Sequence, residues 1–231
     1  MGSDYAYGVC KEWLDYVLDQ PAEEKKIVGN DGFTTTQDIG NGGKMLADFA
    51  ACKDAKTAEL TIYEVAALRY YTSPAFRWLN NPLRRKIKPV PLPATTLFIY
   101  DALKKLRAVH LVSAKKFKAR YLWRGMKDRG VSKEFLMLGG TELACMSTSK
   151  SLPVVAGYAS SRTPLLFRIK VESPMDLGAE IDWCSVFPGE EEVLYPPLTF
   201  LKPMFDQPIM GPDGDALEEG IVVTVKPSFP S

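Results

Sequence analysis

The spacing of apolar residues changes near Lys115, and this change constrains the fold more than any other feature of the chain. Before it, apolar residues recur at helical intervals, as at Ile62, Val65, Ala66 and Leu68. After it, short β-rich runs are separated by Gly, Pro and Ser. Helices first and strands afterwards, without regular alternation, predict an α+β fold and not a parallel doubly wound sheet.

Capping signals and prolines set the expected helix boundaries. Thr61 and Glu64 have the spacing of a capping box, and Ser73-Pro74 places a cap before a proline at the first helical position. Ser3 or Asp4 can cap the first helix, which ends before Pro21. The expected helices lie at about 4–20, 45–51, 62–68, 74–83 and 95–106, and residues 28–43, rich in Gly, Asn, Thr and Asp, are expected to form a long loop.

The second part of the chain predicts a β core. Its expected strands lie at 121–123, 142–146, 165–171, 192–195, 199–201 and 221–225, with one helix at 152–159. We expect a single domain over 1–231, in which a helical part at about 1–110 packs on a β core at about 115–231. The basic run Arg84, Arg85, Lys86 and Lys88 is expected to be a solvated face.

Composition excludes several classes of function. The 231 residues are 46% hydrophobic and 25% charged, as in ordinary globular proteins. A net charge of +1 provides no global field for a nucleic acid, so we expect no nucleic-acid partner. No apolar run approaches the roughly 20 residues of a membrane helix. The N-terminus lacks the basic start and apolar stretch of a signal peptide, so we expect a protein of the cytoplasm or one delivered into a host cell, and the sequence does not distinguish the two.

Metal ligands are scarce in the sequence. The four cysteines form no C-x-x-C pair, and His110 is the one histidine. A zinc site would need scattered ligands, so we expect no metal. The even count leaves disulfides open, but four half-buried free thiols is the simpler interpretation.

Two motifs carry side chains that suit a dinucleotide. Arg124 offers a planar fork of donors for a diphosphate, and Gly125 beside it allows a ligand to approach the backbone closely. Ser147, Thr148 and Ser149 follow a strand-like run, where their hydroxyls can line a ribose pocket or cap the next helix. Taken singly, each motif also fits an ordinary structural role.

A pair of glutamates forms the third motif. On an extended strand, Glu190 and Glu192 would project from the same face while Glu191 points away. Two like charges on one face of an apolar strand are destabilising unless they are used. The preceding Pro188-Gly189 leaves a solvated acidic loop as the alternative.

Together these motifs resemble the mono-ADP-ribosyltransferase family of the Arg-Ser-Glu class, which includes vertebrate ecto-enzymes and bacterial toxins and effectors. Arg124 matches the family's first-strand arginine, Ser147 opens its S-T-S motif, and Glu190-x-Glu192 matches its E-x-E motif. The resemblance covers about residues 60–205. Val193-Leu194 and Pro196-Pro197 match the usual continuation of the E-x-E motif, and Ser185 and Phe187 fall in the family's acceptor-recognition loop. Upstream, the family's helical region is matched by Tyr71-Thr72, Asn80 or Asn81, and Leu83-Arg84.

The resemblance implies a mixed or antiparallel β core of two sheets and NAD as a substrate. Cleavage of the nicotinamide–ribose bond creates an oxocarbenium-like centre, and Glu192 is expected to stabilise it electrostatically. Arg124 would hold the diphosphate, and Ser147 would position the ribose and Glu192. Gly125 would meet the nicotinamide amide through its backbone, and Thr148 and Ser149 would complete the NAD site.

The first glutamate implies the acceptor. A guanidinium is a poor nucleophile while protonated, and Glu190 can orient it and take its proton. We therefore expect transfer to an arginine of a protein. Trp183 and Phe187 could flank that guanidinium by cation–π stacking, with Ser185 between them in the loop.

Three alternatives stay open at this point. Water could replace the acceptor, which would make the protein an NAD glycohydrolase. The acceptor could be a hydroxyl residue of a small protein such as ubiquitin. The chain could also be a catalytically inactive module that binds NAD.

Overall fold

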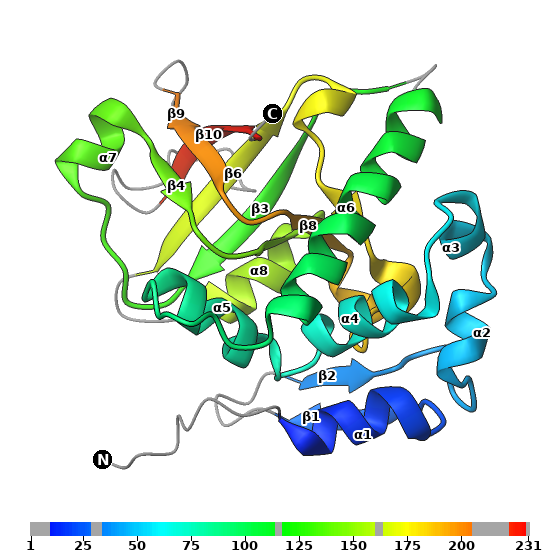
Figure 1. The fold of residues 1–231 in the computed structure, drawn as a ribbon. Coiled ribbons are helices and arrows are strands. Elements are labelled where there is room, and N and C mark those ends of the chain that lie inside the picture. Colours follow the sequence, from blue (N-terminus) through cyan, green and yellow to red (C-terminus); the bar gives the residue numbers. More distant parts are fainter. Residues whose placement is uncertain (1–9, 29–33, 114–116, 160–163, 205–221, 230–231) are drawn as a thin grey trace, which may run out of the picture.

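The computed structural model describes residues 10–28, 34–113, 117–159, 164–204 and 222–229. A helical layer packs against one part of a large mixed β-sheet, and a small hairpin lies beside the first helix (Figure 1). The helices are α1 (Lys11–Asp19), α2 (Leu46–Ala50), α3 (Lys53–Thr57), α4 (Ile62–Thr72), α5 (Phe76–Arg84), α6 (Pro93–Ser113), α7 (Lys133–Leu138) and α8 (Leu152–Ala159). The α+β prediction is confirmed.

The strands form two sheets of unequal size. The hairpin pairs β1 (Lys25–Val28) with β2 (Thr34–Gln37). The large sheet has the order β4-β9-β10-β6-β3-β5-β8-β7, in which only β10 and β6 are parallel. Its strands are β3 (Arg120–Met126), β4 (Gly140–Glu142), β5 (Met146–Ser149), β6 (Leu165–Val171), β7 (Ala179–Glu180), β8 (Glu192–Tyr195), β9 (Thr199–Pro203) and β10 (Val222–Ser228).

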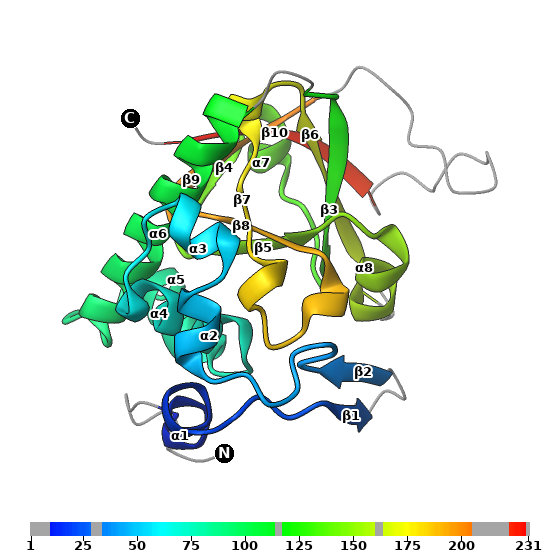
Figure 2. The ribbon, with the colours of Figure 1, turned by 90° about the vertical axis from the view of Figure 1, so that its right-hand side faces the viewer.

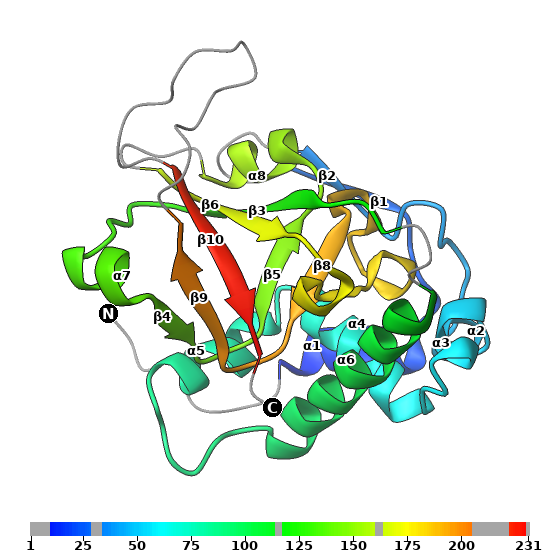
Figure 3. The same cartoon turned by 90° about the horizontal axis from the view of Figure 1, so that it is seen from above.

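The large sheet has two parts that meet at one residue pair. Between β3 and β5 the register contains only Trp123 opposite Ser149. Strand β5 then crosses the direction of β3 and β6, as the view from above shows (Figure 3). The two sheets that the family resemblance implies correspond to these two parts, which are joined edge to edge.

Two apolar cores lie on opposite faces of the part formed by β5, β8 and β7. Leu68, Ile99 and Leu103 from the helices pack with Leu194 on the first face. Val193 and Tyr195 point to the second face and pack with the interior of the other part. Alternation along β8 therefore puts Glu192, which shares the face of Leu194, on the helical side.

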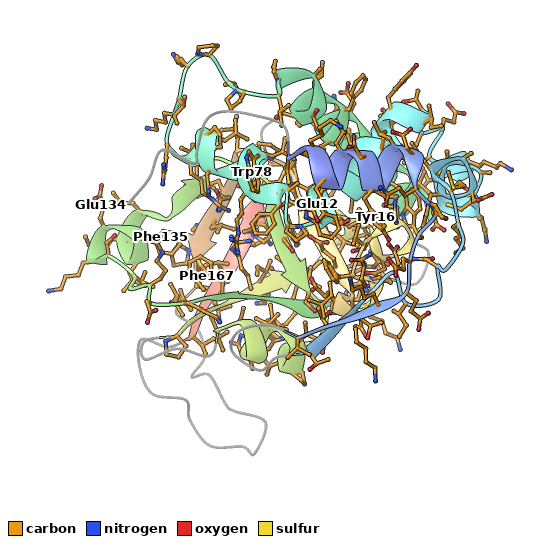
Figure 4. All side chains as sticks on the ribbon, turned by 90° about the horizontal axis from the view of Figure 1, so that it is seen from below. Glu12, Tyr16, Trp78, Glu134, Phe135 and Phe167 are labelled. Atoms are coloured by element: carbon orange, nitrogen blue, oxygen red, sulfur yellow. The ribbon has the colours of Figure 1, made fainter. Side chains whose placement is uncertain are left out.

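Strong local signals were interpreted correctly. The structure has the predicted capping box at Thr61 and Glu64, and the predicted bounds of α8, β6 and β8 agree with it. The predicted helix at 95–106 extends to Pro93–Ser113. The short α7 was not predicted from the sequence. Ser132 caps this helix by accepting from the amide of Phe135, and the ring of Phe135 stacks on Phe167 with ring centroids 5.5 Å apart (Figure 4). The short α3 was also missed.

Two predictions were wrong. The expected loop at 28–43 contains strand β2, because Thr34–Gln37, which includes three β-branched threonines, pairs with β1. The expected strand at 142–146 is interrupted, since the carboxylate of Glu142 accepts a hydrogen bond from the backbone of Ala144 at 3.0 Å and turns the chain. The predicted caps Ser3 and Asp4 and the strand residue Ile221 lie outside the described residues.

Candidate functional site

The three residues of the Arg-Ser-Glu pattern meet where β3, β5 and β8 lie next to one another. Arg124 of β3 donates from Nη1 to the backbone carbonyl of Ser147 on β5 at 2.9 Å. The side chain of Ser147 is hydrogen-bonded to the carboxyl group of Glu192, the first residue of β8. Positions far apart along the chain therefore converge on one point beneath α4 and α5.

Glu192 is a buried carboxyl group with an unusual affinity for its proton. Its side chain lies on the helical face with 5% of its surface exposed. Burial raises the pKa of Glu192 to about 8, and the charges of Glu190 and Asp182 act in the same direction. The hydrogen bond from Ser147 and the charge of Arg124 oppose this shift. A positive charge placed in this site would therefore favour the ionised form.

Two guanidinium groups share one carboxylate beside Ser147. Arg84 of α5 binds Glu142 in a bidentate manner, with contacts of 3.0 and 3.1 Å. Arg124 lies 3.9 Å from the same carboxylate. Burial and the nearby Arg84 lower the pKa of Arg124. Arg84 and Arg124 carry two positive charges and Glu142 carries one negative charge, so the cluster has a net positive charge. Their planar guanidinium groups can donate paired hydrogen bonds, which suits a diphosphate.

Arg84 is the site residue that sequence reasoning missed. It was assigned to a solvated basic face, but its side chain is only 34% exposed and is paired with Glu142. The sequence signal that could have found it is the family-like run from Asn80 to Leu83-Arg84, which was noted only as part of a helical region.

Buried polar contacts hold the helices against the start of β5. The hydroxyl group of Tyr71 donates to the carbonyl of Cys145 at 3.3 Å. The side-chain amide of Asn80 donates to the same carbonyl and to Tyr71, both at 3.1 Å. Cys145 comes two residues before Ser147, so this network sets the position of Ser147 relative to α4 and α5.

Glu190 does not share a strand with Glu192. It closes a short 3₁₀ turn, η3 (Pro188–Glu190), and Glu191 then has a left-handed φ of +49°. The argument from alternation on one strand was therefore wrong for this pair, because the left-handed residue resets the direction of the chain. The charge of Glu190 nevertheless raises the pKa of Glu192, which indicates that the two carboxyl groups are near each other.

The other two hydroxyl residues of the S-T-S motif bond to backbone. Thr148 is buried, and its hydroxyl donates to the carbonyl of Val193 at 2.7 Å. Ser149 donates to the carbonyl of Glu190 at 2.7 Å and accepts from the amide of Ser151 at 2.9 Å. These contacts hold β5 against β8 and anchor the turn that carries Glu190.

The predicted acceptor residues belong to residues 181–190, which we call the acceptor loop. Ser185 is buried and accepts from the amide of Phe187 at 3.0 Å. Trp183, from η2 (Asp182–Cys184), instead lines a cavity of about 330 Å³ together with His110 and Asp182. The lining of this cavity includes none of Arg124, Ser147, Glu190 and Glu192, but it includes Asp182, whose charge raises the pKa of Glu192.

Other features of the described residues concern metals, thiols and membranes. No cluster of three or more potential metal ligands occurs within the described ranges. All four cysteines are free; Cys145 and Cys184 are buried, and Cys10 and Cys52 are half-buried. Among the helices that the structure describes, none has the length and apolar character needed to cross a membrane.

Comparison with known proteins finds similarity in structure. No protein-family model and no curated protein sequence matches the chain. The ADP-ribosyltransferase HopU1 of Pseudomonas syringae pv. tomato DC3000 is 18% identical, with 78% of this chain and 82% of that chain covered and a TM-score of 0.54. The C3 exoenzyme of Clostridium limosum is 20% identical, with 80% of this chain and 95% of that chain covered and a TM-score of 0.53.

A third similar structure is the eucaryotic mono-ADP-ribosyltransferase ART2.2, in a variant complexed with NADH. It is 17% identical, with 80% of this chain and 75% of that chain covered and a TM-score of 0.56. Identities this low establish the architecture. The chain has the fold of the ADP-ribosyltransferases.

Proposed function

We propose that the protein is a mono-ADP-ribosyltransferase that cleaves NAD, releases nicotinamide and transfers ADP-ribose to an arginine of another protein. The observation that carries this proposal is the convergence of Arg124 and Glu192 on Ser147. The fold supports it, because the structurally similar proteins are ADP-ribosyltransferases and one of them was solved with NADH. We also propose that the protein acts as a toxin or effector.

The arginine cluster is the proposed diphosphate site. Arg124 and Arg84 both face Glu142, so a diphosphate can take donors that the single carboxylate leaves available. Gly125, half-buried next to Arg124, is proposed to meet the nicotinamide amide through its backbone. Thr148 and Ser149 are proposed to act on NAD through the backbone that they hold.

Glu192 is the proposed residue for bond cleavage. As the bond between C1′ of the ribose and the nicotinamide nitrogen breaks, its electron pair leaves with nicotinamide and positive charge develops on the ribose. An ionised Glu192 near the 2′-hydroxyl stabilises that charge in a site that excludes water. The hydrogen bond from Ser147 supports the ionised form.

Glu190 is the proposed residue for acceptor activation. A nitrogen of the arginine acceptor forms the new bond to C1′, and Glu190 takes the proton that this nitrogen loses. Glu190 lies at the end of the acceptor loop, two residues before Glu192. Its charge raises the pKa of Glu192, as expected for a neighbouring carboxyl group. We propose that Phe187 and Ser185 shape the entrance for the acceptor arginine. Trp183 is proposed to support the acceptor loop from its other side.

The decisive experiment substitutes Glu192 and follows labelled NAD. We expect Glu192→Gln to lower transfer of ADP-ribose to protein by about 10²–10³-fold, the range for loss of one electrostatic stabiliser. The matched control is Glu191→Gln, which changes the exposed neighbour and should retain transfer. Transfer by Glu192→Gln at the parent rate would refute the proposal. Free ADP-ribose without labelled protein would identify the parent as a glycohydrolase.

A further inference from the structure

The N-terminal segment, residues 10–28 and 34–44, packs behind the acceptor loop. Figure 2 shows the β1–β2 hairpin and the chain after it next to the turns that precede β8. Strand β2 contacts η3, the turn that contains Glu190. This segment precedes the part of the sequence that the family resemblance covers, yet it lies against the proposed acceptor site.

The contact is centred on a buried ion pair. Arg69 of α4 donates from Nη1 and Nη2 to the carboxylate of Asp38, at 3.1 and 3.2 Å. The two side chains are 3% and 0% exposed. The hydroxyl group of Tyr16, on α1, donates to the same carboxylate at 2.5 Å, and the guanidinium carbon of Arg69 lies 3.9 Å from the ring centroid of Phe49.

Both members of the pair hold the acceptor loop by its backbone. Arg69 also donates to the carbonyl of Cys184 at 3.1 Å. The backbone amide of Asp38 donates to the carbonyl of Val186 at 2.7 Å. The amide of Val186 in turn donates to the hydroxyl of Thr72 at 3.0 Å. The loop is thereby fixed a few residues before Glu190.

A buried ion pair contributes little net stability to a fold. Desolvation of two charges offsets most of their attraction, and apolar side chains of similar volume often stabilise a core as well. The pair adds orientation, because the planar guanidinium of Arg69 binds Asp38 and the carbonyl of Cys184 at the same time and so restricts the placement of the loop.

We propose that Asp38 and Arg69 are positioning residues for Glu190, so that the N-terminal segment sets the efficiency of transfer to the acceptor and not that of NAD cleavage. This inference rests on the proposed function. Glu192 and Ser147 lie within the pairing of β5 with β8. Glu190 lies outside that pairing, at the end of the acceptor loop, where Ser149 binds its backbone carbonyl. A displacement of about 1 Å at a reacting group can cost about 10²-fold in rate.

The test compares two activities of the same variants. For Asp38→Asn we expect the rate of ADP-ribose transfer to an arginine acceptor to fall at least about tenfold. NAD hydrolysis without acceptor should stay within about twofold of the parent, because the β5–β8 pairing is unchanged. Thr72→Val removes the hydroxyl that accepts from the amide of Val186 and donates to the carbonyl of Arg69. It should shift the ratio in the same direction, and it provides the test if Asp38→Asn does not fold.

The matched control is Glu64→Gln, which weakens another ion pair of α4 at the end of the helix away from the loop. Assays are made below the unfolding temperature of every variant, and the control should lower both activities equally or neither. Equal losses of transfer and hydrolysis in Asp38→Asn and Thr72→Val, or an unchanged ratio, would overturn the inference. A parent protein without turnover of NAD would instead overturn the proposed function.

Discussion

Replacement of Glu192 by glutamine should stabilise the folded protein in alkaline solution. Burial raises the pKa of this carboxyl group from its ordinary 4.5 to about 8 in the folded state. Between these two values the folded chain keeps a proton that the unfolded chain has released. The free energy of unfolding of the parent therefore falls as the pH rises through this window, and the loss is complete above about pH 8.

The structure sets the size of this effect. The difference between 4.5 and about 8 in pKa corresponds to about 5 kcal/mol, at about 1.4 kcal/mol per pH unit. Glu192 is only 5% exposed, so solvent screens this energy little. Glutamine carries no charge at any pH and escapes this penalty. In a chain of this length, about 5 kcal/mol corresponds to roughly 10–20 °C in melting temperature.

The assay is thermal unfolding of the parent and Glu192→Gln at pH 5 and pH 9. We expect the melting temperature of Glu192→Gln, relative to that of the parent, to increase as the pH rises, with most of this increase between pH 5 and pH 8. The matched variant Glu191→Gln, at an exposed position, should follow the parent at both values. A difference between Glu192→Gln and the parent that is the same at pH 5 and pH 9 would refute the reasoning.

Three further predictions follow from the same site. Arg84→Ala should raise the KM for NAD by about 10–100-fold, the range for loss of charge-assisted hydrogen bonds, and steady-state kinetics would contradict the diphosphate role if KM did not change. Glu190→Gln should suppress transfer to arginine and spare NAD hydrolysis; equal loss of both would contradict its role. The kcat/KM for NAD should rise with pH, reach half of its maximum near pH 8 and level off above about pH 9, since ionised Glu192 is the active form; a profile already flat from pH 6 to pH 9 would exclude this assignment.

Local sequence determined the elements with self-sufficient signals. The capping box at Thr61 and Glu64 and the apolar run at 165–171 specify their structures through neighbours a few residues away. The order of helices before strands likewise predicted the α+β class. Helix α7 has only six residues, so its local signals, the cap at Ser132 and Gly139 after its end, do not predict it without the packing of Phe135 on Phe167.

The site shows the same division between local and distant causes. The sequence by itself determined which residue types are available for NAD, because a permanently charged Arg124 and the acidic run at 190–192 are chemical facts of the chain. Only the tertiary structure decided that Arg84 joins Arg124 at Glu142, that burial keeps Glu192 protonated to about pH 8, and that Asp38 supports the acceptor loop. Contact and desolvation depend on groups distant in sequence, so spacing alone does not encode them.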